Sequence, residues 1–404
     1  MNPLTLAWRN VARNRRRSLL TGGILAFGFA SFTLSAGFMA QSFHGLRDST
    51  IRSGIGHLQF ADARTFTQSE DAPLQFGLKD ADAIMATIAK DPAVRVVMPR
   101  LEFMGLITAR ARSVPFVGVG VDPLAEKTGT DIPTTISAGR WLDDNGRALV
   151  LGTGLARTLN VSVGDGVTLL ATTPEGTLNA VDAVVTGLAD VHFKELNDRY
   201  LAAPLALAQQ LLDAPGTVSK ISVVLHATGH EAETAQRLTT VLGGNLAVRS
   251  WEQLAQFYNQ VKMLYIGIFG FMSIVLMVVV FLASVNTTLM TVTERTREIG
   301  TLRALGARPR VVLTNFVLEG TVLGLAASAA GALLSLLISA GLNASAIEMP
   351  PPPGVTRGIP IHVQFFALAY VSAALAMTLT SVVASYFPAR RAARISIVEA
   401  LTHV

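Results

Sequence analysis

The sequence has 404 residues, of which 50% are hydrophobic and only 15% are charged, and its mean hydropathy is +0.45. Ordinary soluble domains carry about 25% charged residues. The composition therefore excludes a purely soluble protein and predicts membrane-spanning segments. The sequence contains no cysteine, so disulfide bonds contribute nothing to its stability.

The first 18 residues combine an apolar helical spacing with a cluster of arginines. Leu4, Trp8 and Val11 recur at helical intervals, and tryptophan favours the headgroup boundary of a bilayer. We predict an interfacial helix over residues 1–18, with membrane-interface residues Trp8, Arg13, Arg15, Arg16 and Arg17. A basic start before an apolar run is also typical of a secretory signal peptide. The run is about twice as long as in such peptides, which favours a membrane span.

Four apolar runs are long enough to cross a bilayer core of about 30 Å. Three of them carry no charge, and the fourth contains Glu319. A charged carboxylate is costly in lipid, so we expect Glu319 either to pair with an arginine of the preceding connector or to contact water at the boundary. The predicted spans are residues 19–41, 263–288, 311–342 and 364–388.

Basic residues are concentrated in three segments outside these spans. Residues 1–18, 286–310 and 389–404 hold 13 basic and 3 acidic residues, whereas residues 41–263 hold 19 basic and 23 acidic residues. Cytoplasmic segments near span ends carry the Lys/Arg excess. We therefore predict that both termini are cytoplasmic and that residues 42–262 are extracytoplasmic. The net charge of +5 reflects this bias and does not indicate nucleic-acid binding.

Residues 42–262 read as an α+β domain that is large enough to bury its own core. Strands are expected over residues 57–60, 95–109, 115–121, 148–151, 166–171, 181–188 and 221–225. Helices are expected over residues 81–90, 154–159, 204–211 and 231–242. Turns at Asp144-Asn145-Gly146 and Gly164-Asp165-Gly166 suggest a separate β-rich lobe over Gly139–Ala171. Trp251–Lys262 is expected to run as a helix into the second span, so that spans one and two form a stalk.

The third span has small residues at four-residue spacing, at Gly320, Gly324 and Ser328. Small side chains let helix backbones approach closely in lipid. We favour an interface with another chain over packing within one chain. The next segment, residues 343–363, contains Pro350–Pro353, which predicts an extended outer loop.

The connector between spans two and three, residues 289–310, contains a charged helical segment. Val292–Ala307 places Val292, Ile299, Leu302 and Leu305 roughly on one side and the charged residues mostly on the other. Gly306 followed by Pro309 predicts the end of the helix. This segment is either a solvated connector or a docking element for a soluble partner.

Motifs for catalysis or cofactor binding are missing from the sequence. It has no Gly-Lys pair and hence no P-loop, and it has no HExxH or GxSxG motif. Gly152-Thr-Gly154 is only a fragment of a dinucleotide fingerprint. His226 and His230 are four residues apart, but Gly229 disfavours a shared helical face for a metal. We predict a non-catalytic subunit with no metal or cofactor of its own.

Three segments resemble one family of membrane proteins. They are L-A-W-R-N-V-A-R-N-R-R-R near the N-terminus, E-R-T-R-E-I-G-T-L-R-A-L-G-A in the connector, and F-P-A-R-R-A-A-R-I-S-I-V-E-A-L near the C-terminus. Together with the order of spans, they are similar to the type VII ABC transporter permeases, the group of MacB, LolC/LolE and FtsX. The resemblance implies an α-helical membrane protein with four transmembrane helices and a MacB-like extracytoplasmic α+β domain between spans one and two. Because MacB carries a fused ATPase and this chain has no P-loop, the resemblance is greater to the lipoprotein-releasing LolC/LolE-type permeases.

The resemblance also implies a function and partners. It implies a bacterial inner-membrane permease that couples ATP hydrolysis to movement of the outer domain, for release or export of a lipoprotein. The alternatives are regulation of an extracytoplasmic enzyme by mechanotransmission and MacB-like efflux. Partners would be two copies of an ABC ATPase that bind ATP and Mg, a second permease copy or paralogue, lipids, and a lipoprotein, chaperone or adaptor. The implied ATPase-docking residues are Glu294, Arg295, Arg297, Glu298, Gly300, Arg303, Leu305 and Gly306.

Overall fold

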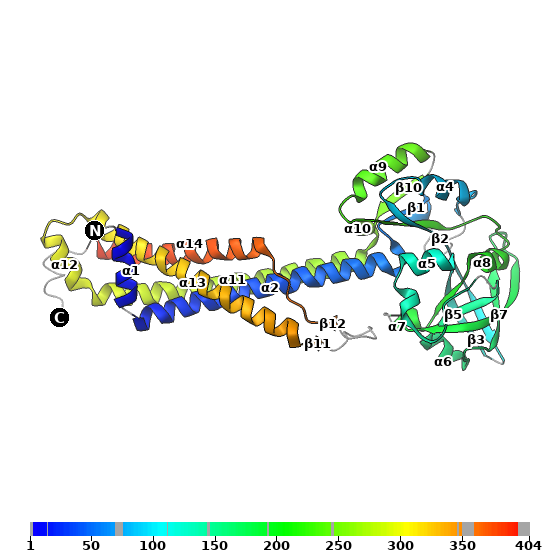
Figure 1. Cartoon of the computed structure of the whole chain (residues 1–404), viewed down its shortest axis with the longest axis horizontal. Coiled ribbons are helices and arrows are strands. Elements are labelled where there is room, and N and C mark those ends of the chain that lie inside the picture. The colour runs from blue at the N-terminus through cyan, green and yellow to red at the C-terminus, as the bar shows by residue number, and fades with distance from the viewer. Residues whose placement is uncertain are drawn as a thin grey trace. The chain divides into compact units, whose positions relative to one another are not determined.

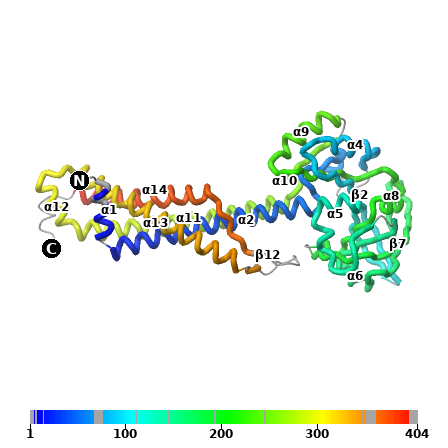
Figure 2. Tube along the Cα trace, in the orientation of Figure 1, coloured from blue at the N-terminus to red at the C-terminus, as the bar shows by residue number. Residues whose placement is uncertain are grey.

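The computed structural model describes residues 3–13, 15–68, 76–110, 112–143, 146–191, 194–243, 246–345, 347–349 and 359–394. The chain divides into a helical unit and an outer unit. The helical unit comprises Met1–His44, Val261–Glu348 and Pro360–Val404, and the outer unit comprises Gly45–Gln260 and Met349–Ile359. Figures 1 and 2 show the course of the chain within each unit. The predicted proline loop at Pro350–Pro353 lies outside the described residues.

Four helices are long and apolar enough to cross a membrane, as the sequence predicts. They are α2 (Arg15–Thr50), α11 (Gln256–Glu294), α13 (Pro309–Ser345) and α14 (Ala367–Ala392). The first two are much longer than the spans predicted over residues 19–41 and 263–288, because the helical pattern continues into more polar sequence. Before α11, the expected continuous helix is interrupted at Ala255, whose ψ of 68° is not helical and separates it from α10 (Trp251–Leu254).

Small residues of α13 allow close packing against helices of the same chain. A Cβ atom on Gly324 would lie 2.8 Å from Thr378 Cα of α14, and one on Gly331 would lie 2.7 Å from the carbonyl oxygen of Ala26 in α2. Gly320 and Ser328 are also buried, and Ser381 Oγ donates a hydrogen bond to the Gly320 carbonyl at 2.8 Å. The preference for an interface with another chain is therefore wrong for these residues, since the span's small face is already occupied within the chain.

The outer unit is built on a ten-stranded mixed sheet with the order β10-β1-β9-β2-β3-β8-β5-β7-β4, in which β6 pairs with β2 and β7. All seven predicted strands are present. The sequence patterns missed β4, β8 and β10, which are only four or five residues long and owe their pairing to distant strands. The strands are β1 (Leu58–Asp62), β2 (Val94–Ala109), β3 (Arg112–Val121), β4 (Ile136–Gly139), β5 (Ala148–Gly152), β6 (Gly166–Thr172), β7 (Leu178–Ala189), β8 (Tyr200–Pro204), β9 (Lys220–Leu225) and β10 (Leu246–Ser250). Two-residue strands β11 (Glu348–Met349) and β12 (Ile359–Pro360) pair separately.

The four helices predicted for the outer unit are present, and several short ones accompany them. The outer helices are α3 (Thr65–Gln68), α4 (Ala81–Ile88), α5 (Pro123–Gly129), α6 (Thr153–Leu159), α7 (Lys194–Asn197), α8 (Leu205–Leu212) and α9 (Glu231–Leu242), with a 3-10 turn η2 (Ile132–Thr135). α6 and α8 contribute Leu155 and Leu211 to a core that also holds Leu101 and Phe103 of β2.

The separate lobe predicted over Gly139–Ala171 does not exist. Leu149 of β5 and Leu169 of β6 belong to the same hydrophobic core as Phe103 of β2. The predicted turn at Gly164-Asp165-Gly166 is real, because Gly164 has a φ of +99°. Asp144 and Asn145, however, lie outside the described residues. Local turn signals cannot reveal that the strands beside them pair with distant partners such as β2, and this pairing merges the segment into the main sheet.

A buried arginine of β2 joins α5 to the segment that follows α2. This segment is a π-helical turn, η1 (Ile51–Ile55), and Gly54 within it has a φ of +103°, which favours glycine. Arg100 Nη1 donates to Glu126 Oε1 at 2.9 Å and to the Gly54 carbonyl at 3.2 Å. The side chains of Arg100 and Glu126 are only 7% and 1% exposed. The guanidinium therefore ties η1, β2 and α5 together inside the outer unit.

Candidate partner-docking helix

The connector between α11 and α13 contains a short helix, α12 (Thr296–Ala304). The single helix predicted from Val292 is broken at Arg295, whose φ of −95° and ψ of 7° separate α12 from the end of α11. At the other end Gly306 has a φ of +94°, and the amide of Ala307 donates to the Leu302 carbonyl at 3.1 Å. The predicted stop at Gly306 is therefore correct, because a left-handed glycine closes the last turn.

The apolar residues of this connector do not share one buried face. Val292 and Ile299 are 6% and 5% exposed and pack with Val312 and Phe316 of α13. Leu302 and Leu305, in contrast, are 49% and 81% exposed. The predicted single apolar side is wrong, because within α12 Ile299 packs against α13 whereas Leu302, three residues later, is exposed. Two leucines of the connector, Leu302 and Leu305, are therefore left on the surface.

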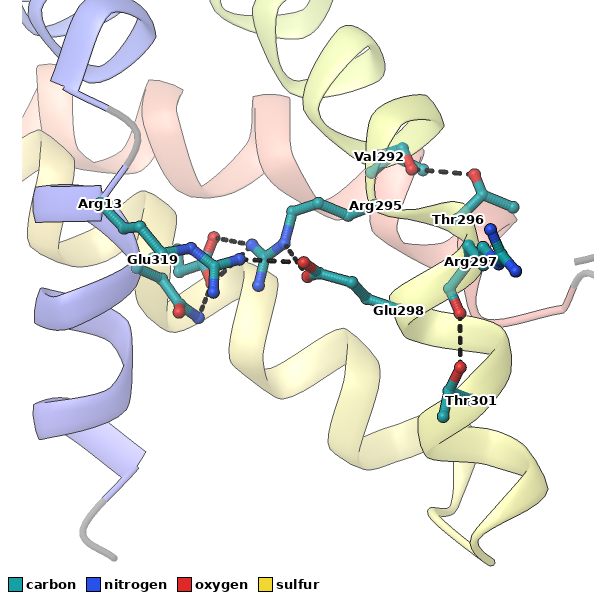
Figure 3. Close-up of polar contacts among 9 residues, drawn as sticks. Arg13, Val292, Arg295, Thr296, Arg297, Glu298, Thr301 and Glu319 are labelled. Carbon is teal, nitrogen blue, oxygen red and sulfur yellow. Dashed lines mark hydrogen bonds and ion pairs between the residues drawn. The ribbon is translucent and has the colours of Figure 1, made fainter. Parts of the chain in front are cut away.

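Arg295 turns inward and pairs with the carboxylate of the third span. Its Nη1 lies 3.0 and 3.1 Å from the two carboxylate oxygens of Glu319, and Asn10 Nδ2 donates to Glu319 Oε1 at 2.5 Å (Figure 3). The Arg295 and Glu319 side chains are 18% and 14% exposed. Burial opposes the charged form of Arg295, but the carboxylates of Glu319 and Glu298 raise its pKa above the ordinary value. Of the two alternatives for Glu319, the arginine pair is the one observed.

The N-terminal helix α1 (Pro3–Arg13) contacts the same connector through charged side chains. Arg13 Nη2 donates to Glu298 Oε1 at 3.0 Å, and Glu298 Oε2 accepts from Arg295 Nε at 3.2 Å (Figure 3). Arg17 at the start of α2 forms an ion pair with Glu294. Among the predicted interface residues, Arg13 and Arg17 therefore bind the connector, whereas Trp8, Arg15 and Arg16 remain exposed.

The eight predicted docking residues thus differ in their exposure and fall into three groups. Arg295 and Gly300 are directed inward, so their assignment to an exposed docking face is wrong; Gly300 is buried, and Arg295 holds Glu319. Arg303 is half-buried, and Glu294 and Glu298 are about half exposed while engaged with arginines. The exposed side chains on α12 and its C-terminal turn include Arg297, Leu302 and Leu305, with Gly306 beside them. The sequence did not identify Leu302 as a surface residue, because its helical spacing grouped it with Val292 and Ile299, which are buried.

No metal-binding constellation accompanies this helix. Among the residues that the structure describes, no group of three or more histidine, aspartate and glutamate side chains is placed to hold a metal ion. His226 follows β9 directly and His230 precedes α9, and Gly229 between them has a φ of +96°. The two imidazoles therefore do not lie on a common helical face.

Comparisons with known proteins match both units. The model of the MacB-like periplasmic core domain matches residues 18–241, and that of the FtsX-like permease C-terminal domain matches residues 270–397. The lipoprotein-releasing system transmembrane protein LolC of Xylella fastidiosa is 27% identical over 362 residues, covering 84% of each chain. The macrolide export ATP-binding/permease protein MacB of Escherichia coli K12 is 28% identical over 424 residues, covering 98% of this chain but 60% of MacB.

Solved structures of outer domains are also similar. The periplasmic region of MacB from Actinobacillus actinomycetemcomitans covers 52% of this chain and 95% of its own, with 13% identity and a TM-score of 0.37. The two family models account for four long apolar helices with a periplasmic domain between the first and second. The chain therefore belongs to the FtsX-like permeases that carry a MacB-like periplasmic core domain, the type VII ABC transporter permeases.

Proposed function

We propose that this chain is the permease subunit of an ATP-driven complex and that the exposed face of α12 docks on a separate ATPase subunit. The proposal rests on one observation: one side of α12 is attached to α13, and the other side is exposed. Ile299 and Arg295 attach it to α13, while Leu302, Leu305 and Arg297 face outward. A helix held in this way can accept an apolar contact on one side and pass its displacement to the spans on the other.

We place the ATPase on another chain, and the lack of a P-loop in this sequence supports that choice. The arginine excess of residues 1–18, 286–310 and 389–404 supports a cytoplasmic location for α12 and both termini. α2 and α11 each continue from the helical unit into the outer unit. A movement at the α12 end can therefore reach the outer unit along the helices themselves. By analogy with relatives of this family, the complex would contain two permeases and two ATPases.

For the cargo, we propose release or export of a lipoprotein from the inner membrane. The match to LolC supports this choice, because it covers the same large share of both chains, whereas MacB extends well beyond the matched region. The competing hypotheses are regulation of an extracytoplasmic enzyme and efflux of a small molecule. Mass spectrometry of the purified complex, combined with a lipoprotein-release assay on spheroplasts, distinguishes them. Lipoprotein retained in cells that lack the chain supports release.

The docking proposal is tested by Leu305→Asp, with Leu124→Asp as the matched control. Both leucines are highly exposed, at 81% and 75%, and Leu124 lies in α5 of the outer unit. A charge at position 305 should abolish copurification of the P-loop ATPase subunit and its activity in the complex, because an aspartate would be buried without a partner. Leu124→Asp should retain both. Normal ATPase recovery with Leu305→Asp would contradict docking at α12.

The orientation is tested at the same two positions with cysteine, which the native chain lacks. An impermeant thiol reagent applied to spheroplasts should label a cysteine at position 124 and should leave one at position 305 unlabelled until the membrane is opened. The reverse pattern would refute the proposed topology.

A further inference from the structure

A groove of about 980 Å³ lies on one face of the outer sheet. Its lining follows the strand order from Arg249 on β10 through Gln59 on β1 and Lys220 on β9 to Tyr200 on β8. From β10 to β8 there are five inter-strand steps of about 4.8 Å, so the groove is roughly 24 Å long. Its volume is in the upper range of small-molecule sites.

The two ends of the groove differ in polarity. At the β10 and β1 end, the lining consists of Arg249, Gln59 and Gln253 with Phe66. At the β2, β3 and β8 end, it consists mainly of apolar side chains. Met104 and Val117 face each other across the β2–β3 ladder, and Leu196 lies near β8. Met104 is 50% exposed and Leu196 is 39% exposed, although both are apolar. A polar end and an exposed apolar end along one groove favour an elongated amphipathic ligand.

The charge that has no ion-pair partner at the polar end of the groove is positive. Each carboxylate that lines the groove has a basic partner: Asp131 pairs with Arg52, Glu102 with Lys220, and Asp48 with Arg47. Arg249 is half-buried, and its guanidinium carbon lies 5.2 Å from the centre of the Phe66 ring. Within the described part of the chain, Arg249 forms no ion pair. A guanidinium stacked on a ring and left without a carboxylate is suited to bind one anionic group.

A second unused polar group lies at the opposite end. Tyr200 lines the groove, is only 6% exposed, and its hydroxyl has no hydrogen-bond partner among the described residues. Burial raises the pKa of Tyr200, and the nearby Glu126 carboxylate raises it further, so the hydroxyl remains a hydrogen-bond donor. Buried hydroxyl groups are normally satisfied. The Tyr200 hydroxyl is itself buried, so Tyr200 marks this end of the groove and its hydroxyl is not a contact for a bound ligand.

We propose that this groove binds a single-chain anionic lipid, with its acidic head at Arg249 and its acyl chain over Met104 and Val117. The head supplies the missing negative partner of Arg249, and the chain covers the apolar lining of β2 and β3. The head is a carboxylate or a phosphate ester, because a guanidinium binds either one through two parallel hydrogen bonds. The site lies entirely within the outer unit, so it is independent of whether α12 docks on an ATPase.

Photolabelling of the full-length chain in lipid nanodiscs tests the site. The probe is a laurate derivative with a diazirine at its methyl end, and labelled peptides are located by mass spectrometry. Wild-type protein should be labelled on β2 and β3 near Met104 and Val117. Labelling of the membrane spans serves as the internal reference. Arg249→Gln should weaken binding about tenfold, the loss expected for one charge-assisted hydrogen bond. Arg249→Lys should retain part of the binding.

Two controls make the test specific. Arg157→Gln changes an exposed arginine of the same unit that does not line the groove, and it should label like wild type. The methyl ester of the probe, which lacks the charge, should label about tenfold less. Dodecyl phosphate should compete with the probe, whereas inorganic phosphate should not.

Four outcomes overturn the proposal. Absence of labelling on β2 and β3 excludes the lipid. Equal labelling by acid and ester, or by wild type and Arg249→Gln, excludes the head contact. Competition by inorganic phosphate alone shows an anion site only. Competition by an unacylated acidic peptide, with none by dodecyl phosphate, shows that the groove binds peptide.

Discussion

Removal of one partner of the buried Arg100–Glu126 pair should destabilise the outer unit strongly. Both side chains are less than one-tenth exposed and lie 2.9 Å apart. Breaking such a pair leaves an uncompensated buried charge and costs about 3–5 kcal/mol. For a domain of this size, 1 kcal/mol shifts the unfolding temperature by about 2–4 °C. We therefore expect Arg100→Met or Glu126→Leu to lower the unfolding temperature of the outer unit by roughly 6–20 °C.

The double variant, Arg100→Met with Glu126→Leu, distinguishes the cost of an unpaired buried charge from the cost of losing the ion pair itself. Replacement of both charges by apolar side chains should recover most of the loss, because no unpaired charge remains. The Gly54 carbonyl keeps a donor in every variant, since Ser222 Oγ donates to it at 2.9 Å. Thermal unfolding of the purified full chain measures all three variants. Arg52→Met, which breaks the exposed Arg52–Asp131 pair at 3.0 Å, should cost less than about 1 kcal/mol. Additive losses in the double variant would refute the reasoning.

Two further predictions each concern one residue, Arg295 in the helical unit and His57 in the outer unit. Arg295→Glu places a second negative charge about 3 Å from Glu319 and should reduce ATPase copurification about tenfold or more. Adding Glu319→Arg restores an opposite-charge pair and should restore copurification. If the double variant recovers no binding, the pair does not position α12. His57 is buried and accepts a hydrogen bond from the Leu225 amide at 3.2 Å, and burial lowers its pKa below the ordinary 6.5. The unfolded chain then binds more protons, so stability should be full above pH 6.5 and fall as the pH drops from 6.5 to the folded pKa. His57→Gln should remove this slope in thermal unfolding, whereas exchange of the exposed His226 should not.

The spans and most of the outer strands could be predicted because their signals are local. An uncharged apolar run of sufficient length has few alternatives to a membrane helix. Alternating or continuous apolar runs marked seven strands with boundaries within a few residues, and Glu231–Leu242 was predicted with both ends correct. The stop at Gly306 likewise needs only one residue in the left-handed conformation.

Predictions that depended on distant partners were less successful. Strands β8 and β10 are short and become strands only by pairing with β3 and β1. The segment Gly139–Ala171 looked separate because its turns are local, while its pairing with β2 is not. The sequence indicated that an arginine of the connector could pair with Glu319, but it could not show that this arginine is Arg295, 24 positions away.

The sequence by itself determined that this is a membrane protein with four spans, a large polar insertion and one charged connector helix. These features follow from hydropathy and helical periodicity, which a chain carries within short windows. Only the tertiary structure decided which side of α12 is free, where the small residues of α13 pack, and that a groove crosses the outer sheet from Arg249 to Tyr200. Each of these depends on side chains that lie far apart in the sequence and meet only when helices and strands are packed together.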